Sequence, residues 1–236
     1  MEGVYESVHN ARWSHAEELP DGVERKKTGT GMEVREGKPE QSWSYRKADD
    51  AIEGNDAVQQ FGAARLRLMV LASEKGWPYS WNLIQGSSND FFVNCEVDRV
   101  WQIVKGNLTA FFSPHGMTDF TPERRVLIGT PGIGKSMAAG SYLLYQLLHC
   151  DAEKLQVVVH CFGGGDAYVS DKTTRAVTRC SDEDMCISEL RILRGAWDER
   201  VYYLRCGKGG NATTEKFCAY FWMGHDCGVI PKGNQL

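Results

Sequence analysis

The distribution of apolar and polar residues divides this chain into several parts. Residues 1–60 are polar, carry charges of both signs and are repeatedly interrupted by Gly and Pro. Such a segment buries too little apolar surface to offset the entropy cost of ordering it, so we predict a disordered N-terminal arm over residues 1–60. Its large aromatic residues, Trp13, Trp43 and Tyr45, are candidates for docking on the folded part or on a partner.

Residues 61–121 predict a small α+β unit. Short apolar runs at 66–71 and 91–93 are typical of strands, and the Gly-Trp-Pro-Tyr sequence at 76–79 predicts a turn. A helix follows, because apolar residues spaced by three and four positions share one helical face. These residues are Val97, Val100, Trp101, Val104 and Leu108. Asn94, just ahead of two acidic residues, suits the N-terminus of this helix.

Residues 122–178 alternate between strand and helix patterns. A short apolar strand at 126–128 precedes a helical segment at 137–148. The β-branched apolar run at 155–162 is typical of a strand buried on both faces of a parallel sheet. This order predicts a right-handed βαβ unit, and residues 168–178 predict a hairpin.

The segment between the first strand and the helix carries a specific motif. Gly129-Thr130-Pro131-Gly132-Ile133-Gly134-Lys135-Ser136 fits GxxxxGK[ST], the phosphate-binding P-loop. The glycines permit backbone conformations that leave successive N–H groups free to surround a β-phosphate, and the helix that opens at Lys135 adds its positive end. Lys135 would reach the β- and γ-phosphates, and Ser136 would offer its hydroxyl to Mg²⁺. The alternative is a glycine-rich turn that matches by chance.

Pattern and motif together predict an α/β fold with a partial P-loop NTPase-like parallel sheet and flanking helices, preceded by the α+β unit and the disordered arm. The nucleotide-binding core, residues 122–178, is incomplete. A working P-loop ATPase needs a second acidic residue at the end of an apolar strand to hold Mg²⁺, and the sequence has no such stretch. Asp166, after the strand at 155–162, is a candidate metal ligand, although an aspartate in a turn is the simpler interpretation.

Residues 179–236 show no sustained periodicity, and we predict an aberrant, poorly packed tail. Shifting the reading frame by one base, in codons allowed for residues 197–207, gives Gly-Met-Lys-Gly-Tyr-Ile-Ile-Tyr-Asp-Val, an apolar strand that ends in the missing acid. The same frame turns residues 221–231 into a second apolar strand. We therefore hypothesise that a frameshift produced the tail, which sequencing the gene across this region would test. A zinc site is disfavoured, because the cysteine and histidine spacings match no zinc pattern. The residues concerned are Cys206, Cys218, His225 and Cys227.

Composition narrows the classes of function. The 236 residues, of which 42% are hydrophobic, can form one core of ordinary size. A net charge of -4 argues against general electrostatic binding of nucleic acid, and we find no direct nucleic-acid motif. No apolar run is long enough to cross a membrane, and no signal peptide is evident. We expect a cytoplasmic or nuclear chain without a membrane partner, whose 8 cysteines are thiols.

Four stretches resemble the trypanosomatid retrotransposon hot spot protein family. They are the P-loop segment 125–148, the following residues 151–159, and residues 81–94 and 34–39 upstream. The resemblance implies a multigene family, nuclear or perinuclear localisation, and a part in transcription or RNA handling with nuclear protein or RNA-associated partners. Members of the family are much longer, so the resemblance also implies a truncated chain.

The sequence therefore predicts binding of ATP or GTP with Mg²⁺. We expect hydrolysis to be crippled, because the chain has lost the Walker B strand, the apolar strand whose final acidic residue would hold Mg²⁺. Two alternatives stay open. One is an active NTPase completed by a partner chain or by Asp166. The other is a non-enzymatic nuclear interaction module or a pseudogene product.

Overall fold

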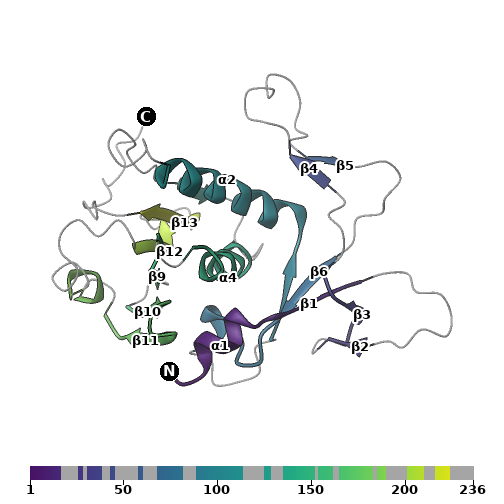
Figure 1. The fold of residues 1–236 in the computed structure, drawn as a ribbon, viewed down its shortest axis with the longest axis horizontal. Coiled ribbons are helices and arrows are strands. Elements are labelled where there is room, and N and C mark those ends of the chain that lie inside the picture. The colour runs from purple at the N-terminus through teal and green to yellow at the C-terminus, as the bar shows by residue number, and fades with distance from the viewer. Residues whose placement is uncertain are drawn as a thin grey trace.

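The computed structural model shows a mixed α/β protein with two main β-sheets and a helix, α4 (Lys135–Leu148), between them (Figure 1). The structure describes residues 1–16, 26–28, 31–38, 43–45, 58–60, 68–81, 89–113, 125–128, 135–151, 154–161, 165–182, 185–189, 201–209 and 216–223.

The first sheet has five strands, and all of its neighbouring pairs are antiparallel. Its order is β2 (Lys26–Lys27), β3 (Glu33–Glu36), β1 (Arg12–His15), β6 (Met69–Ala72) and β7 (Asp90–Val93). A separate pair is formed by β4 (Trp43–Tyr45) and β5 (Val58–Gln60). The strands predicted near 66–71 and 91–93 are confirmed as β6 and β7, and a 3₁₀ turn, η2 (Pro78–Ser80), occupies the predicted turn between them.

The predicted helix after β7 is confirmed as α2 (Cys95–Phe111). Asn94 is its N-cap, and the Asn94 side chain accepts a hydrogen bond from the backbone N–H of Val97 at 3.0 Å. Such a cap satisfies one of the donors that a helix N-terminus leaves without an intrahelical partner. All five of the residues predicted to share one face are buried.

The second sheet has six strands and corrects the predicted parallel sheet. Its order is β11 (Ala176–Cys180), β10 (Ala167–Asp171), β9 (Val157–Cys161), β12 (Val201–Gly209), β13 (Lys216–Met223) and β8 (Arg125–Ile128). Only the β9 and β12 neighbours are parallel, and the other four pairings are antiparallel. The physical reason is that two hairpins, β10–β11 and β12–β13, contribute antiparallel strands. The β10–β11 hairpin itself is confirmed as predicted from residues 168–178.

Strand β9 is buried on both faces, as its β-branched sequence predicts. Val158 packs into a large core with α4, whereas Val157 and Val159 pack into a smaller core on the opposite face. The larger core also contains Met69 and Leu71 of the first sheet. The two sheets therefore share one continuous core around α4.

The predicted disorder of residues 1–60 is wrong for the N-terminal segment. Residues Val4–His9 form helix α1, which lies against the second sheet and α4 (Figure 1). Val4, Tyr5 and Val8 are buried in the large core. The segment is poor in apolar residues, but their spacing places them on one helical face, and the core formed by distant segments supplies the surface on which that face is buried.

The predicted poor packing of the tail is also wrong for residues 201–204. Strand β12 lies between β9 and β13, and Val201–Leu204 are buried. Tyr202 and Leu204 face the large core, whereas Val201 and Tyr203 face the smaller one. A strand in this position can be apolar without alternation, because both of its faces are covered.

Candidate functional site

The P-loop motif lies in the structural context that its chemistry requires. Strand β8 ends at Ile128, and α4 begins at Lys135. The predicted glycine-rich residues between them, Gly129, Thr130, Pro131, Gly132, Ile133 and Gly134, lie outside the described residues. Lys135 and Ser136 are the first two residues of α4, so the motif stands between a strand and a helix, as the P-loop requires.

The body of α4 is fixed by a buried contact with α2. The hydroxyl of Tyr142 donates a hydrogen bond to the Asp98 carboxylate at 2.8 Å, and both side chains are buried. Tyr142 also has Leu143 and Leu144 beside it, each almost fully buried. Because α4 is held on several sides, the position of its N-terminus is fixed by the core and not by the loop alone.

Aromatic residues from the N-terminal segment contact α4 further along. Trp13 of β1 donates its indole N–H to the Tyr145 hydroxyl at 3.0 Å and lies edge-on to that ring. His9 of α1 stacks on His149 with 4.4 Å between ring centroids. The docking predicted for Trp13 is therefore confirmed, whereas nothing is described of the Trp43 and Tyr45 side chains.

The C-terminal end of α4 is capped by a lysine from the β10–β11 turn. Lys172 Nζ donates to the carbonyl oxygens of Leu147 at 3.0 Å and Cys150 at 2.6 Å, and its side chain is buried. Burial lowers the pKa of the Lys172 ammonium below its usual value. The carbonyl end of a helix attracts a cation, so Lys172 stabilises the end of α4 opposite to the loop. Sequence analysis missed this residue, because the contact joins segments that are not adjacent in the chain.

Several strands of the second sheet end at the edge from which the loop leaves β8. Strands β8, β9 and β12 run in the same direction, so their C-terminal ends lie at one edge of the sheet. Ile128 pairs with Cys218, and the β12–β13 hairpin continues past that point to the pair Gly209 and Lys216. The described residues of this projecting part, 208–209 and 216–217, include no Asp or Glu, whereas Glu215, directly before Lys216, lies outside the described residues. Among the described residues of β8, β12 and β13, the edge that carries the loop therefore has no carboxylate.

Asp166, the candidate metal ligand, lies at a distance from strand β8, which precedes the loop. It precedes β10, which is separated from β8 by four steps across the sheet. At about 4.8 Å per step this is roughly 19 Å, too far for a shared metal ion. Arg179 of β11 instead donates to the Asp166 carboxylate from two nitrogens, at 3.1 and 3.4 Å. The arrangement fits an ion pair within the β10–β11 hairpin and does not favour a role as a Mg²⁺ ligand.

The disfavoured zinc residues are divided between described and undescribed parts of the chain. Cys206 and Cys218 belong to β12 and β13, whereas His225 and Cys227 lie outside the described residues. Among the side chains that the structure describes, no group of three or more His, Cys, Asp or Glu residues is arranged to hold a metal ion.

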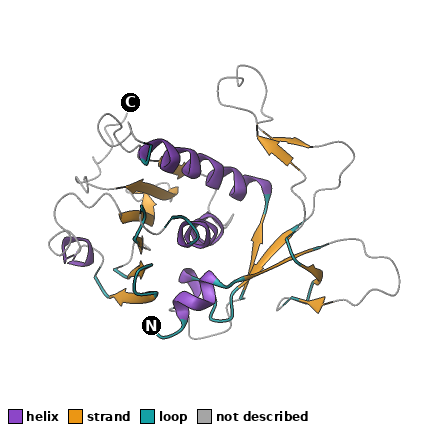
Figure 2. Ribbon diagram, in the orientation of Figure 1, coloured by secondary structure: helices purple, strands orange, loops and turns teal. Residues whose placement is uncertain are grey.

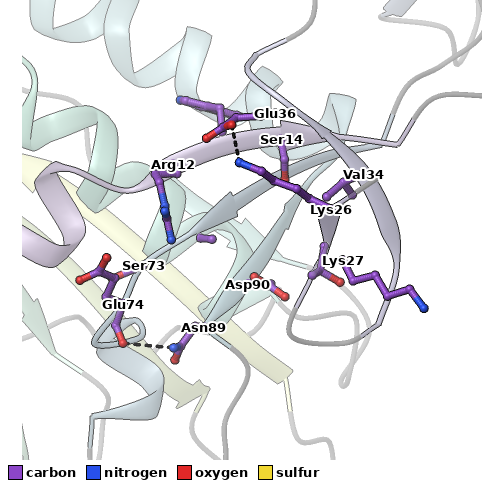
Figure 3. Close-up of a pocket in the computed structure, with 13 residues that line it drawn as sticks. Arg12, Ser14, Lys26, Lys27, Val34, Glu36, Ser73, Glu74, Asn89 and Asp90 are labelled. Atoms are coloured by element: carbon purple, nitrogen blue, oxygen red, sulfur yellow. Dashed lines mark hydrogen bonds and ion pairs between the residues drawn. The ribbon is translucent and has the colours of Figure 1, made fainter. Parts of the chain in front are cut away.

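A pocket of about 310 Å³ lies on the first sheet, near the β2–β3 hairpin (Figure 3). Lys26 crosses it to reach Glu36 at 2.6 Å, which holds the pKa of that carboxyl below its usual value. Arg12 points toward the turn after β6. The charged lining residues are balanced in sign: Arg12, Lys26, Lys27, Glu36, Glu74 and Asp90. Sequence analysis did not predict this pocket, because its lining comes from segments far apart in the chain, and its balanced charge selects no class of ligand.

The fold and the context of the motif together define an α/β protein with a P-loop segment at the start of its central helix. Residues 5–123 match the family description "Retrotransposon hot spot proteins N-terminal", and residues 126–199 match "Retrotransposon hot spot protein, P-loop domain". The chain belongs to the retrotransposon hot spot protein family. Neither curated proteins nor solved structures gave a significant match.

The two family matches cover different regions of the chain. The first match crosses residue 60, so the N-terminal segment and the unit that follows it belong to one family region. The second includes the motif but ends at residue 199, before β12 begins. No helix of the described residues is long and apolar enough to cross a membrane.

Proposed function

We propose that this chain binds ATP or GTP together with Mg²⁺ at the loop between β8 and α4. The observation that carries the proposal is the start of α4 at Lys135, directly after the glycine-rich segment, within a region matched as a P-loop domain. Backbone N–H groups at a helix N-terminus attract phosphate through their partial positive charge. Gly129 to Gly134 would surround the phosphates, Lys135 would supply a cation and Ser136 would supply a hydroxyl ligand to Mg²⁺.

Two features of the structure support phosphate binding at this end of α4. Lys172 fixes the opposite end of α4, and Tyr142 fixes its middle. The nucleotide therefore does not have to order this helix. A preorganised site loses less entropy on binding.

The residues at this edge of the second sheet also support the expectation that hydrolysis is slow. Turnover needs Mg²⁺ to be held by an acidic residue and a water to be oriented for in-line attack. The described ends of β8, β12 and β13 carry no Asp or Glu, with Glu215 outside the described residues, and Asp166 is bound to Arg179. We infer that the chain binds the nucleotide without efficient catalysis. This rests on the composition of the edge and not on the frameshift hypothesis.

A titration with a fluorescent ATP analogue tests the binding proposal. The wild-type chain should bind in a Mg²⁺-dependent manner, and unlabelled ATP or GTP should compete, which also measures the base preference. Lys135→Ala should lose binding, because the phosphates lose the cation that the motif places there. Lys154→Ala is a matched control that removes a lysine elsewhere on the described surface.

The outcomes separate the alternatives. Affinity that is unchanged in Lys135→Ala would show that the loop is not the binding site. Absence of binding by a wild-type protein that unfolds cooperatively would favour the non-enzymatic interaction module.

A further inference from the structure

Two cysteine side chains pack at the same small core at the outer strand of the second sheet. Cys180 is the last residue of β11, and Cys186 belongs to the helical segment 185–189. Cys186 is a member of the smaller core and Cys180 packs against the same core, and both cysteines are free. Sequence analysis treated them only as reduced thiols, because a spacing of six residues does not by itself bring two side chains together.

An aspartate fixes this arrangement through the backbone. Asp182 accepts a hydrogen bond from the N–H of Met185 with its side chain, at 2.9 Å. Its backbone carbonyl accepts from the N–H of Cys186 at 3.0 Å. This is the arrangement of a helix N-cap. The cap holds the first turn of the segment against the end of β11, so the proximity of the thiols is a property of the fold.

The two thiols differ in their surroundings. Cys186 is 3% exposed and packs in the smaller core with Cys161 and Ala167. Ala167 of β10 pairs with Cys161 of β9 on one side and with Cys180 of β11 on the other. Its small side chain therefore lies between Cys161 and Cys180 across the sheet. Cys180 is only partly buried and packs against the outside of this core. A solvent-borne reagent therefore reaches Cys180 before Cys186.

We propose that Cys180 and Cys186 form a redox-responsive dithiol, which a peroxide oxidises to an intramolecular disulfide. The Cys180 thiolate attacks one peroxide oxygen, the O–O bond breaks, and Cys180 becomes a sulfenic acid while hydroxide leaves. The Cys186 sulfur then attacks the sulfenic sulfur. The S–S bond forms, the S–O bond breaks, and the departing hydroxide takes the Cys186 proton to leave as water. The two electrons go to the peroxide, and a small thiol such as dithiothreitol reverses the oxidation.

The surroundings of the two cysteines decide that Cys180 reacts first and Cys186 second. Burial, together with the interaction of its S–H with the Cys180 sulfur, raises the pKa of the Cys186 thiol to about 12, so this group stays protonated and is a poor first nucleophile. Cys186 is therefore the resolving cysteine. Both side chains pack at the same small core, so disulfide formation requires a local movement that brings the sulfurs to the S–S bond length of about 2.05 Å.

The chain offers a direct measurement, because trypsin cleavage after Arg179 and Arg191 leaves both cysteines on one peptide, residues 180–191. The reduced full chain is treated with stoichiometric hydrogen peroxide, blocked with iodoacetamide and digested. The expected product is this peptide without alkylation and lighter by two hydrogen atoms. After dithiothreitol treatment the peptide should carry two alkyl groups. Cys95 and Cys150, also partly buried, serve as internal controls and should stay alkylated.

A variant isolates the intermediate. In Cys186→Ser, oxidation should stop at the Cys180 sulfenic acid, which dimedone labels. Dimedone should label the wild-type chain only weakly, because its sulfenic acid is converted to the disulfide. The proposal is overturned if the wild-type peptide stays doubly alkylated while other cysteines are oxidised, or if Cys180 pairs with a cysteine outside the peptide. Both of these contrary outcomes are read from the wild-type chain, so the test does not depend on the folding of Cys186→Ser.

Discussion

The Tyr142 hydroxyl and the Asp98 carboxylate are 2.8 Å apart in the buried contact between α4 and α2. This hydrogen bond joins the helix that begins at the candidate phosphate loop to the longest helix of the N-terminal region, across 44 positions of sequence. It therefore connects the two regions that match separate family descriptions.

Tyr142→Phe should destabilise the whole chain. The substitution keeps the ring but removes a donor from a buried carboxylate, which costs about 1–3 kcal/mol. Urea unfolding measures the change in the free energy of unfolding. Tyr145→Phe is the matched control, because its hydroxyl accepts from Trp13 in a partly buried contact and should matter less. Equal losses in the two variants would contradict the special weight given to the Asp98 contact.

Replacing Lys172 by Met should weaken the end of α4. Met keeps much of the apolar stem but removes the donor that the carbonyls of Leu147 and Cys150 share. Hydrogen bonds from charged groups contribute about 1.5–3 kcal/mol each, offset in part by relief of the buried charge. Hydrogen exchange of the last turn of α4 should accelerate more than that of α2. Uniform acceleration in both helices would indicate global destabilisation instead of a local cap.

His160 should make the protein sensitive to acid. Burial lowers its pKa to about 3, whereas an unfolded histidine titrates near 6.5. Between these values the unfolded chain binds a proton that the folded chain does not, so the free energy of unfolding falls as pH falls. The slope contributed is at most about 1.4 kcal/mol per pH unit.

Urea titrations between pH 4 and pH 7 measure this slope, and His160→Gln should reduce it. Some slope should persist, because burial also lowers the pKa of His149. An identical slope in the variant would assign the acid sensitivity to other groups.

Leu204→Ala should cost about 2–5 kcal/mol, because Leu204 is 1% exposed in the large core. The measurement tests whether β12 is part of the cooperative fold. A loss below about 0.5 kcal/mol, typical of surface substitutions, would restore the interpretation of residues 179–236 as a poorly packed tail.

Phosphate release should be slow even where nucleotide is bound. Losing one positioned electrostatic element typically costs a factor of about 10² to 10³ in rate, and the edge beside the loop carries no described carboxylate. A coupled phosphate assay at saturating ATP and Mg²⁺ measures turnover. A rate of about 1 s⁻¹, the low end of typical enzymes, that is abolished in Lys135→Ala would overturn this expectation and point to an acid supplied by a partner chain.

The sequence by itself determined the local elements whose patterns are strong. The apolar face and Asn94 cap of α2, the strand β9 and the β10–β11 hairpin depend on spacings of a few residues, which local sterics and hydrogen bonding translate directly into structure. The start of α4 after the glycine-rich motif also followed from the sequence.

Only the tertiary structure decided which strands are neighbours and which weak segments are folded. Val4 and Val8 on α1 have too little apolar surface to order a helix alone, but the core around α4 buries them. The local pattern does not encode the insertion of β12 between β9 and β13, the capping of α4 by Lys172 or the packing of Cys180 and Cys186 at one core. Such contacts arise when the chain packs as a whole, because burial depends on what lies opposite each side chain and not on its neighbours in sequence.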